Sequence, residues 1–122
     1  MFLLIVTNNP MVRDNAQGRP VEFHDADCLG VFKAVRDKIH LGHGLLTHPL
    51  SGSVKPGETP YKTVVVTGGK GDLDHRSLAI IEESIQTCIK LTANVAKKKW
   101  GEKQLADFRL IDYNLIFGDT RE

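Results

Sequence analysis

Two short apolar runs constrain the fold of this chain more than any other feature of the sequence. Phe2 to Thr7 and Thr63 to Thr67 are rich in β-branched residues and too short for typical helices, so they are predicted as buried strands. Apolar residues recur at helical spacing from Leu29 to Ile39 and from Leu78 to Val95. Strand patterns that alternate with helix patterns predict an α/β fold.

Turn and cap residues complete the first half of the predicted order. Asn9 and Pro10 favour the start of a short helix. Val21 to His24 is predicted as a second strand, parallel to the first, because the connection is long enough for a crossover. Asp25 is expected to cap the next helix, and Gly42 is expected to end it.

The second half of the predicted order begins at the strand from Thr63 to Thr67. Gly68 to Gly71 are predicted to form a turn, after which Asp72 or Asp74 begins a long helix. The tail is predicted to hold a strand near Phe108 to Asp112, followed by a short apolar segment.

These elements predict a single small α/β domain over residues 1–122, with a mainly parallel sheet of three to four strands, flanking helices and a long ordered loop at about 41–62. Ligands usually bind such sheets beyond the carboxyl ends of the strands. We therefore expect Asn8, Asn9 and the turn from Gly68 to Gly71 on one rim of the sheet.

Charge and hydropathy argue against two classes of partner. The formal net charge is +1, from 16 basic and 15 acidic residues, whereas nucleic-acid-binding domains usually carry a basic surplus. The run from Lys97 to Lys99 is accounted for by the C-terminal end of a helix dipole. No apolar run reaches the roughly 18 residues of a membrane span. We expect neither a nucleic acid nor a membrane as partner.

The cysteines and the N-terminal residues predict a cytoplasmic protein. Cys28 and Cys88 lie in helical patterns without a CxxC motif, and are expected to be small buried thiols of a reduced protein rather than nucleophiles. The opening "MFLLIV" lacks the positively charged region of a signal peptide and is expected to be a strand.

The segment from His43 to Lys62, "HGLLTHPLSGSVKPGETPYK", has no helical or alternating apolar pattern. Structureless stretches longer than about 12–15 residues are uncommon in compact domains and are often functional. Pro49, Pro56 and Pro60 stiffen the backbone, so a defined shape is expected. The side chains supply hydroxyls and positive charge, with Glu58 as the one acid, which favours a small anion as ligand.

The candidate contacts to this anion are the polar side chains of the segment and its most permissive glycine. They are His43, Thr47, His48, Ser51, Gly52, Ser53, Lys55, Thr59 and Tyr61. An equally weighted alternative is that these hydroxyls satisfy the backbone of the loop itself.

Metal and phosphate-loop chemistry are weaker interpretations. His40, His43 and His48 could gather around a metal, but no cysteine lies among them and Glu58 is the one nearby carboxylate, so we expect no metal or other cofactor. The turn from Gly68 to Gly71 matches no phosphate-loop motif, and the acids that follow it would repel a phosphate.

The block "IHLGHGLLTHPLSGSVKPGETPYKTVVV" carries a resemblance to a known family, together with "LIVTNNP" before it and "LDHRSLAIIEESIQT" and "DFRLID" after it. It resembles the GrdX family, small proteins encoded alongside the glycine, betaine and sarcosine reductase systems of amino-acid-fermenting anaerobes. The resemblance implies a cytoplasmic setting beside those reductases and supplies no catalytic residues. The reductase chemistry itself is not expected here, because the sequence shows no selenocysteine and no paired redox thiol.

Three functions follow as hypotheses. The favoured one is a non-catalytic accessory protein that binds a small anion or a reductase-system protein through His43 to Lys62. The second is a small enzyme acting on an acyl, amino-acid or phosphorylated substrate, with His43 or His48 as acid/base, Lys55 as anion clamp and an oxyanion site at Ser51 to Ser53. The third is a structural module, or a module that forms a homodimer, which uses the apolar "NLIF" near the C-terminus.

Overall fold

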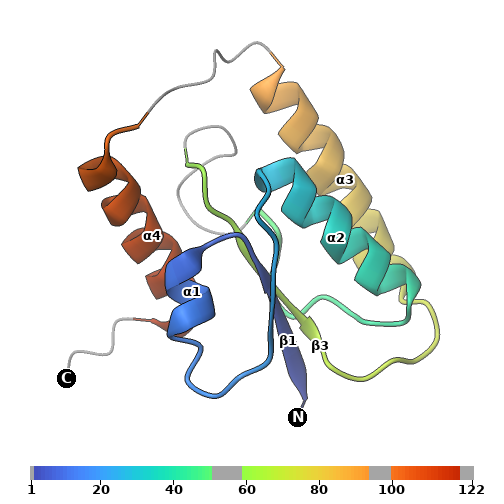
Figure 1. Ribbon diagram of the computed structural model, residues 1–122. Helices are drawn as coiled ribbons and strands as arrows, with labels where there is room; N and C mark the ends of the chain where they lie inside the picture. The colour runs from blue at the N-terminus through green and yellow to red at the C-terminus, as the bar shows by residue number, and fades with distance from the viewer. Residues whose placement is uncertain (1, 51–58, 94–99, 119–122) are drawn as a thin grey trace.

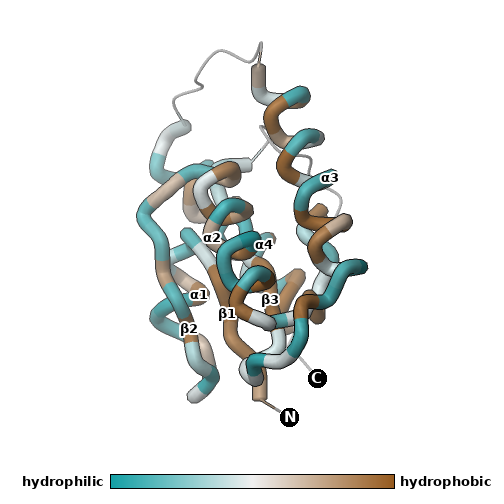
Figure 2. The backbone as a smooth tube through the Cα atoms, turned by 90° about the vertical axis from the view of Figure 1, so that its right-hand side faces the viewer, coloured by the Kyte–Doolittle hydropathy of each residue, from teal (hydrophilic) through white to brown (hydrophobic). Residues whose placement is uncertain are grey.

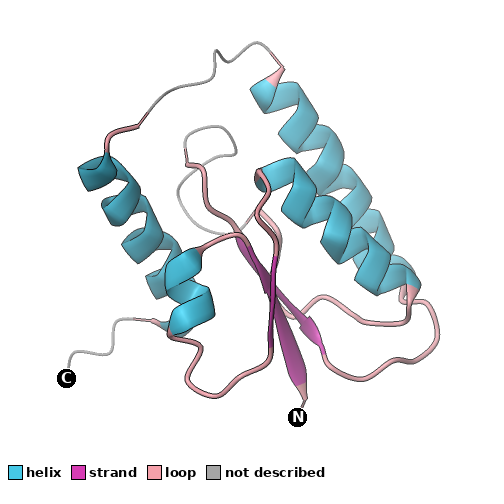
Figure 3. Ribbon diagram, viewed as in Figure 1, coloured by secondary structure: helices cyan, strands magenta, loops and turns pink. Residues whose placement is uncertain are grey.

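The computed structural model of the chain describes residues 2–50, 59–93 and 100–118. Within these ranges the elements follow the order β1 (Leu3–Thr7), α1 (Pro10–Asp14), β2 (Val21–Phe23), α2 (Cys28–His40), β3 (Thr63–Thr67), α3 (His75–Thr92) and α4 (Glu102–Phe117). The sheet lies between two layers of helices, with α1 and α4 on one face and α2 and α3 on the other (Figures 1 and 3). The predicted α/β class is therefore confirmed.

Several predictions concern residues outside the described ranges. They are the site candidates Ser51, Gly52, Ser53 and Lys55, the stiffening residue Pro56, the acid Glu58, Val95, and the lysine run from Lys97 to Lys99.

The sheet is mixed, with the strand order β2-β1-β3. β1 is parallel to β2, where Ile5 pairs with Val21, and antiparallel to β3, where Leu3 pairs with Thr67 and Thr7 with Thr63. The prediction of a mainly parallel sheet is therefore wrong, since one of its two strand pairs is antiparallel. The same antiparallel pairing places Asn8 and Gly68 at opposite ends of the sheet, so the expected common rim is also wrong.

The route of the chain after α2 explains the direction of β3. α2 ends near the amino end of β1, where a parallel strand would begin. Instead, the chain turns at Gly42 and runs back along the sheet before β3 starts. In this stretch Gly44 O accepts from Thr67 N at 2.8 Å, Leu46 N donates to Val65 O at 2.9 Å, and Leu45 pairs with Val66. The first part of the long loop thus covers the outer edge of β3.

The two faces of the sheet bury separate apolar clusters. Val6, Val64 and Val66 pack against α2 and α3, whose buried residues include Phe32 and Ile81. The opposite face carries a smaller cluster that Ile5, Val12 and Val65 form with Tyr113, Ile116 and Phe117 of α4. Figure 2 shows β1 and β3 as mainly apolar, between helices of mixed hydropathy.

The tail is a helix, so the predicted strand near Phe108 to Asp112 is wrong. The apolar residues of α4 fit a two-residue repeat only locally, whereas Tyr113, Ile116 and Phe117 follow the helical repeat and pack on the sheet. Tyr113 also donates from its hydroxyl to Asn15 O at 3.1 Å, which ties α4 to the loop after α1. Tertiary packing therefore decides the conformation of this segment.

Helix caps agree with the sequence in three of four places. Asn9 caps α1, Asp74 caps α3, and Gly42, with a φ of +105°, follows the end of α2. The cap of α2 is Asp27 rather than the predicted Asp25, because Asp27 Oδ1 accepts from Gly30 N at 2.9 Å. Among the helices of the described ranges, none has the length and apolar character needed to cross a membrane.

Candidate functional site

The carboxyl end of β1 and the amino end of β3 meet at a buried cluster of polar side chains. Its members are Thr7, Asn8, Asn9, Lys62, Thr63 and Asp112, all at most 6 % exposed. Burying polar groups is costly unless they form hydrogen bonds, so the contacts within this cluster define its structure.

One chain of hydrogen bonds runs through the cluster with its donor directions fixed. Asn9 N donates to Thr7 Oγ1 at 3.0 Å, and the Thr7 and Thr63 hydroxyls are 2.7 Å apart. Thr63 donates to Asp112 Oδ2 at 2.6 Å, so its proton is used, and the single proton of the Thr7 hydroxyl is shared between Thr63 Oγ1 and Lys62 O, which lies 3.4 Å away. The amide of Asn9 closes the ring, because its Nδ2 also donates to Asp112 Oδ2, at 2.9 Å. Such a chain links β1, β3 and α4 cooperatively.

Asn8 holds the segment that enters β3. Its Nδ2 donates to Pro60 O at 2.8 Å and to Ala26 O at 2.7 Å, while its Oδ1 accepts from Lys62 N at 2.8 Å. All three contacts are to backbone atoms, so they fix the chain path rather than a particular side chain. Asn8 therefore positions Thr59 to Lys62 against the end of the sheet.

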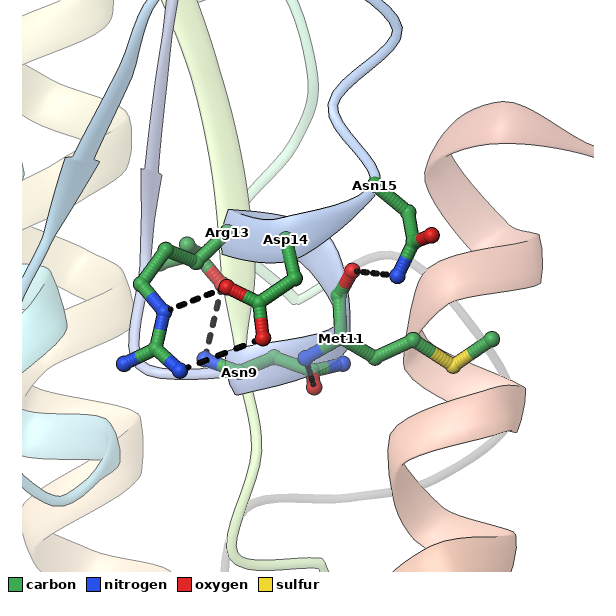
Figure 4. A network of polar contacts seen from close by, with 6 residues as sticks. Asn9, Met11, Arg13, Asp14 and Asn15 are labelled. Atoms are coloured by element: carbon green, nitrogen blue, oxygen red, sulfur yellow. Dashed lines mark hydrogen bonds and ion pairs between the residues drawn. The ribbon is translucent and has the colours of Figure 1, made fainter.

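Asn9 joins the start of α1 to the same cluster (Figure 4). Its Oδ1 accepts from Met11 N at 2.9 Å and its backbone carbonyl accepts from Arg13 N at 3.1 Å, which caps the helix. On the exposed side of α1, Arg13 pairs with Asp14 and Asn15 donates to Met11 O. Because the Nδ2 of Asn9 faces α4, one side chain sets both the first turn of α1 and the position of Asp112.

A pocket opens between this cluster and α4. It encloses about 230 Å³ of space, part of it open solvent. Its lining residues are Thr59, Tyr61, Lys62, Phe108, Ile111, Asp112 and Leu115. The residues from the segment before β3 are polar, whereas α4 contributes apolar side chains around one carboxyl group.

The pocket contains two ionisable groups, the carboxyl group of Asp112 and the amino group of Lys62. Burial raises the pKa of Asp112, against hydrogen bonds from Thr63 and Asn9 and the charge of Lys62, which all lower it. Asp112 is thus more readily neutral than an ordinary carboxyl group. Lys62 is 5 % exposed and lines the same pocket. The pocket therefore combines a cation with a carboxyl group whose ionisation is disfavoured, which favours an anionic ligand.

Arg109 fixes the aromatic wall of the site. Its Nη1 donates to the Tyr61 hydroxyl at 3.1 Å, and its guanidinium lies 5.8 Å from the centre of that ring. Nη2 pairs with Glu102 at 2.5 Å. The phenol of Tyr61 is thereby held against α4.

Exposed apolar side chains surround the mouth of the pocket. Ile111 is 45 % exposed and Leu115 is 49 % exposed, one helical turn apart on α4. Phe108 lies a further turn toward the start of the helix, where its ring meets Trp100 edge-on at 5.5 Å. A ligand with a small apolar part could bury it here.

The structure places the predicted site residues in two groups. Thr59 and Tyr61 line the pocket, and Thr59 Oγ1 also accepts from Tyr61 N at 3.2 Å. His43 lies at the other end of the sheet, where its Nδ1 donates to Thr67 O at 2.5 Å.

Two further candidates contact backbone groups away from the pocket. Thr47 Oγ1 accepts from Val65 N at 3.0 Å, and His48 Nδ1 accepts from Leu50 N at 3.0 Å. These contacts are those expected if the polar side chains of the loop satisfy backbone groups. Ligand binding by any of the nine candidates stays a prediction.

The three histidines considered for a metal do not come together. His40 is exposed at the end of α2 and His48 is exposed in the loop, whereas His43 is buried beside Thr67. Within residues 2–50, 59–93 and 100–118, no three His, Cys, Asp or Glu side chains are grouped as ligands for a metal ion.

Lys62 and Asp112 were missed as site residues. Lys62 is the last residue of the segment predicted to bind an anion and contributes to its positive charge, but it is not among the nine candidate contacts. Asp112 was assigned to a strand, but in the helical repeat of α4 it occupies a buried position beside Tyr113 and Ile116. The signal in the sequence for Asp112 is an acidic residue at a position of the helical repeat that otherwise holds core residues.

Comparisons with known proteins give one match. A family model described as GrdX-like protein matches residues 4–119 of the chain. No curated protein and no solved structure matches it. The matched range extends from β1 past the end of α4, so both sides of the pocket lie within it.

Proposed function

Because the chain belongs to the GrdX-like protein family, we propose that it is a cytoplasmic accessory protein of a glycine- or betaine-reductase type of amino-acid fermentation system, and that it binds a carboxylate at the pocket between Thr59 to Lys62 and α4. The observation that carries the binding proposal is that buried Lys62 lines the same pocket as Asp112, whose pKa is raised by burial. The reductase setting rests on the family resemblance.

The lining residues suit the two parts of a small carboxylate. Lys62 supplies positive charge, and the hydroxyls of Thr59 and Tyr61 supply hydrogen bonds. Asp112, when neutral, donates a hydrogen bond to the bound carboxylate instead of repelling it. Ile111 and Leu115 cover the apolar part of the ligand.

The dimensions of the pocket limit the ligand. The 230 Å³ of space at this site includes open solvent, so the site is a shallow depression and not an enclosed cavity. It offers contacts to the carboxylate group itself, whether of a small free acid or of a partner protein, and the exposed rim of α4 is the surrounding contact surface.

Titration with matched ligands tests the proposal and separates these two sources. Acetate and propionate are compared with acetamide by calorimetry, and a short peptide with a free C-terminal carboxylate is compared with its amidated form. We expect the charged member of at least one pair to bind, and its neutral counterpart to bind at least about tenfold more weakly. If the peptide with the free carboxylate binds and the small acids do not, the natural ligand is the carboxylate of a partner protein. No difference within either pair would overturn the proposal.

Variants assign the binding to the pocket. Lys62→Met keeps the length of the side chain and removes its charge, whereas Lys90→Met removes an exposed charge from α3 and serves as the control. We expect a loss of about tenfold or more for Lys62→Met and no change for Lys90→Met, with circular dichroism confirming that both are folded. Equal affinity in the two variants would contradict the assigned site.

The two alternative functions gain no comparable support from the described residues. Of the two acid/base candidates, His43 contacts Thr67 at the opposite end of the sheet from the pocket, and His48 accepts from Leu50 N and does not line the pocket. In the "NLIF" segment considered for dimerisation, Ile116 and Phe117 pack against the core of the same chain. We therefore propose carboxylate binding without catalysis.

A further inference from the structure

Two cysteines that are distant in the sequence are in contact in the structure. Cys28 Sγ and Cys88 Sγ are 3.6 Å apart although 60 residues separate them. Cys28 is the first residue of α2, and Cys88 lies near the end of α3. The two helices lie side by side on one face of the sheet (Figure 1). Both thiols are free and buried.

The two sulfur atoms are in van der Waals contact, short of bonding distance. A disulfide joins sulfur atoms about 2.05 Å apart, so the pair needs to approach by about 1.5 Å. Rotation of the two side chains supplies part of such a movement without displacement of the helices. α2 and α3 are also joined at a second place further along the helices, where Arg36 Nη1 lies 3.2 Å from Glu82 Oε1.

The surroundings of the pair favour ionisation of one sulfur. The hydrogen bond shared with Cys28 lowers the pKa of Cys88, and the positive charge of Lys62 acts in the same direction on both thiols. Burial and the charge of Asp27 act in the opposite direction. The same hydrogen bond, together with burial, raises the pKa of Cys28, so Cys88 is the sulfur that more readily carries the negative charge.

We propose that Cys28 and Cys88 are a reversible dithiol–disulfide site that is closed by exchange with a small-molecule disulfide such as oxidised glutathione. The site is separate from the carboxylate proposal and does not depend on it. Cytosolic disulfides, where they occur, are usually transient and serve redox sensing or catalysis.

The exchange proceeds in two balanced steps. Cys28 is 7 % exposed and Cys88 is 1 % exposed, so oxidised glutathione reaches Cys28 first, and Cys28 attacks one of its sulfurs as its proton passes to Cys88. The glutathione S–S bond breaks, a mixed disulfide forms on Cys28, and one glutathione thiolate leaves. The thiolate of Cys88 then attacks the Cys28 sulfur, and a second glutathione thiolate leaves. The two protons of the cysteines pass to the two glutathione thiolates. The protein is oxidised by two electrons and the reagent is reduced by two.

A redox titration of the full chain tests the proposal. The protein is equilibrated without oxygen in buffers of reduced and oxidised glutathione, approached from both the dithiol and the disulfide forms because buried thiols exchange slowly. Acid quenching, alkylation and mass spectrometry then give the fraction of disulfide. The same titration in urea gives the value for the unfolded chain.

The test compares the equilibrium constant for disulfide formation in the folded chain with that in the chain unfolded by urea. A disulfide that fits the native structure is favoured in the folded chain over the unfolded chain by about 100-fold. We expect a ratio of that order, with Cys28→Ser and Cys88→Ser giving only mixed disulfides. A ratio below about ten, or mixed disulfides alone on the folded wild-type chain, would overturn the proposal.

Discussion

Thr63 Oγ1 donates a 2.6 Å hydrogen bond to Asp112 Oδ2, and so joins the first residue of β3 to a helix that lies 49 residues later in the chain. The acceptor is a buried carboxyl group and the donor belongs to a strand that pairs with β1. This contact fixes where α4 crosses the sheet, and with it the shape of the pocket.

Removal of the Thr63 hydroxyl should destabilise the protein. Thr63→Val keeps the shape of the side chain but deprives Asp112 of a donor and Thr7 of an acceptor, so we expect the free energy of unfolding to fall by about 1–3 kcal/mol. Urea unfolding measures the change. The control is Thr92→Val, whose hydroxyl donates to Cys88 O within the same helix. A larger loss for the control would contradict the role given to Thr63.

The raised pKa of Asp112 predicts a stability term that fades as pH rises. The folded state holds the proton more tightly than the unfolded state, in which the pKa is near its ordinary value of 3.8. The contribution of Asp112 is therefore fully present below that value and is lost as pH rises through the folded pKa. Urea unfolding from pH 3 to pH 8 should show wild type losing stability relative to Asp112→Asn across this range. A constant difference, or one that grows with pH, would argue against the raised pKa.

Glu22 should show the opposite pH dependence. Burial raises its pKa, but the hydrogen bonds and charges of Lys38 and His24 outweigh burial and lower the pKa below its ordinary value of 4.5. Glu22 Oε1 lies 2.5 Å from Lys38 Nζ, and Oε2 lies 2.7 Å from His24 Nε2. Stabilisation by Glu22 is therefore present above pH 4.5 and lost as pH falls through the folded pKa.

The measurement for Glu22 compares wild type with Glu22→Gln in urea between pH 2.5 and pH 7. We expect the advantage of wild type to shrink toward low pH, and the exposed Glu83→Gln control on α3 to show a smaller change. An advantage that stays level through the acid range would show that the ion pairs between β2 and α2 do not contribute.

Gly42 should tolerate no side chain. Its φ of +105° is a conformation that L residues rarely adopt, and an added Cβ would lie 2.2 Å from the carbonyl oxygen of Gly71. We expect Gly42→Ala to cost about 3 kcal/mol or more, because strain and backbone displacement act together. Gly69→Ala is the control, since a Cβ there meets nothing within 4 Å. Thermal unfolding distinguishes them, and comparable midpoints for the two variants would contradict the steric account.

Local patterns were sufficient to predict most elements of the fold. The strands at β1 and β3 and the helices α2 and α3 follow from apolar spacing, and Asn9, Gly42 and Asp74 delimit helices as predicted. The direction of β3 could not be predicted, because it depends on how residues 41–62 travel along the sheet. That path is set by distant pairs such as Gly44 with Thr67, which leave no local pattern in the sequence.

The candidate site was predicted only in part for a related reason. Thr59 and Tyr61 lie in the segment singled out by its prolines and polar composition, and both line the pocket. The opposite wall comes from α4, whose sequence was interpreted as a strand. Misassignment of that segment hid the helical alignment of Phe108, Ile111 and Leu115. Long-range packing thus decides the site as well as the sheet.

The position of β1 at the centre of the sheet has a consequence for synthesis on the ribosome. β1 is the first strand to be made, and β2 pairs with one of its edges soon afterwards. The other edge receives Thr63–Thr67, which emerges only after α2 and the whole of the long loop have been translated. A nascent chain that does not yet include β3 therefore leaves one edge of β1 unpaired. It also exposes residues such as Val6, which are buried in the folded protein. Such a surface can be bound by chaperones or can aggregate.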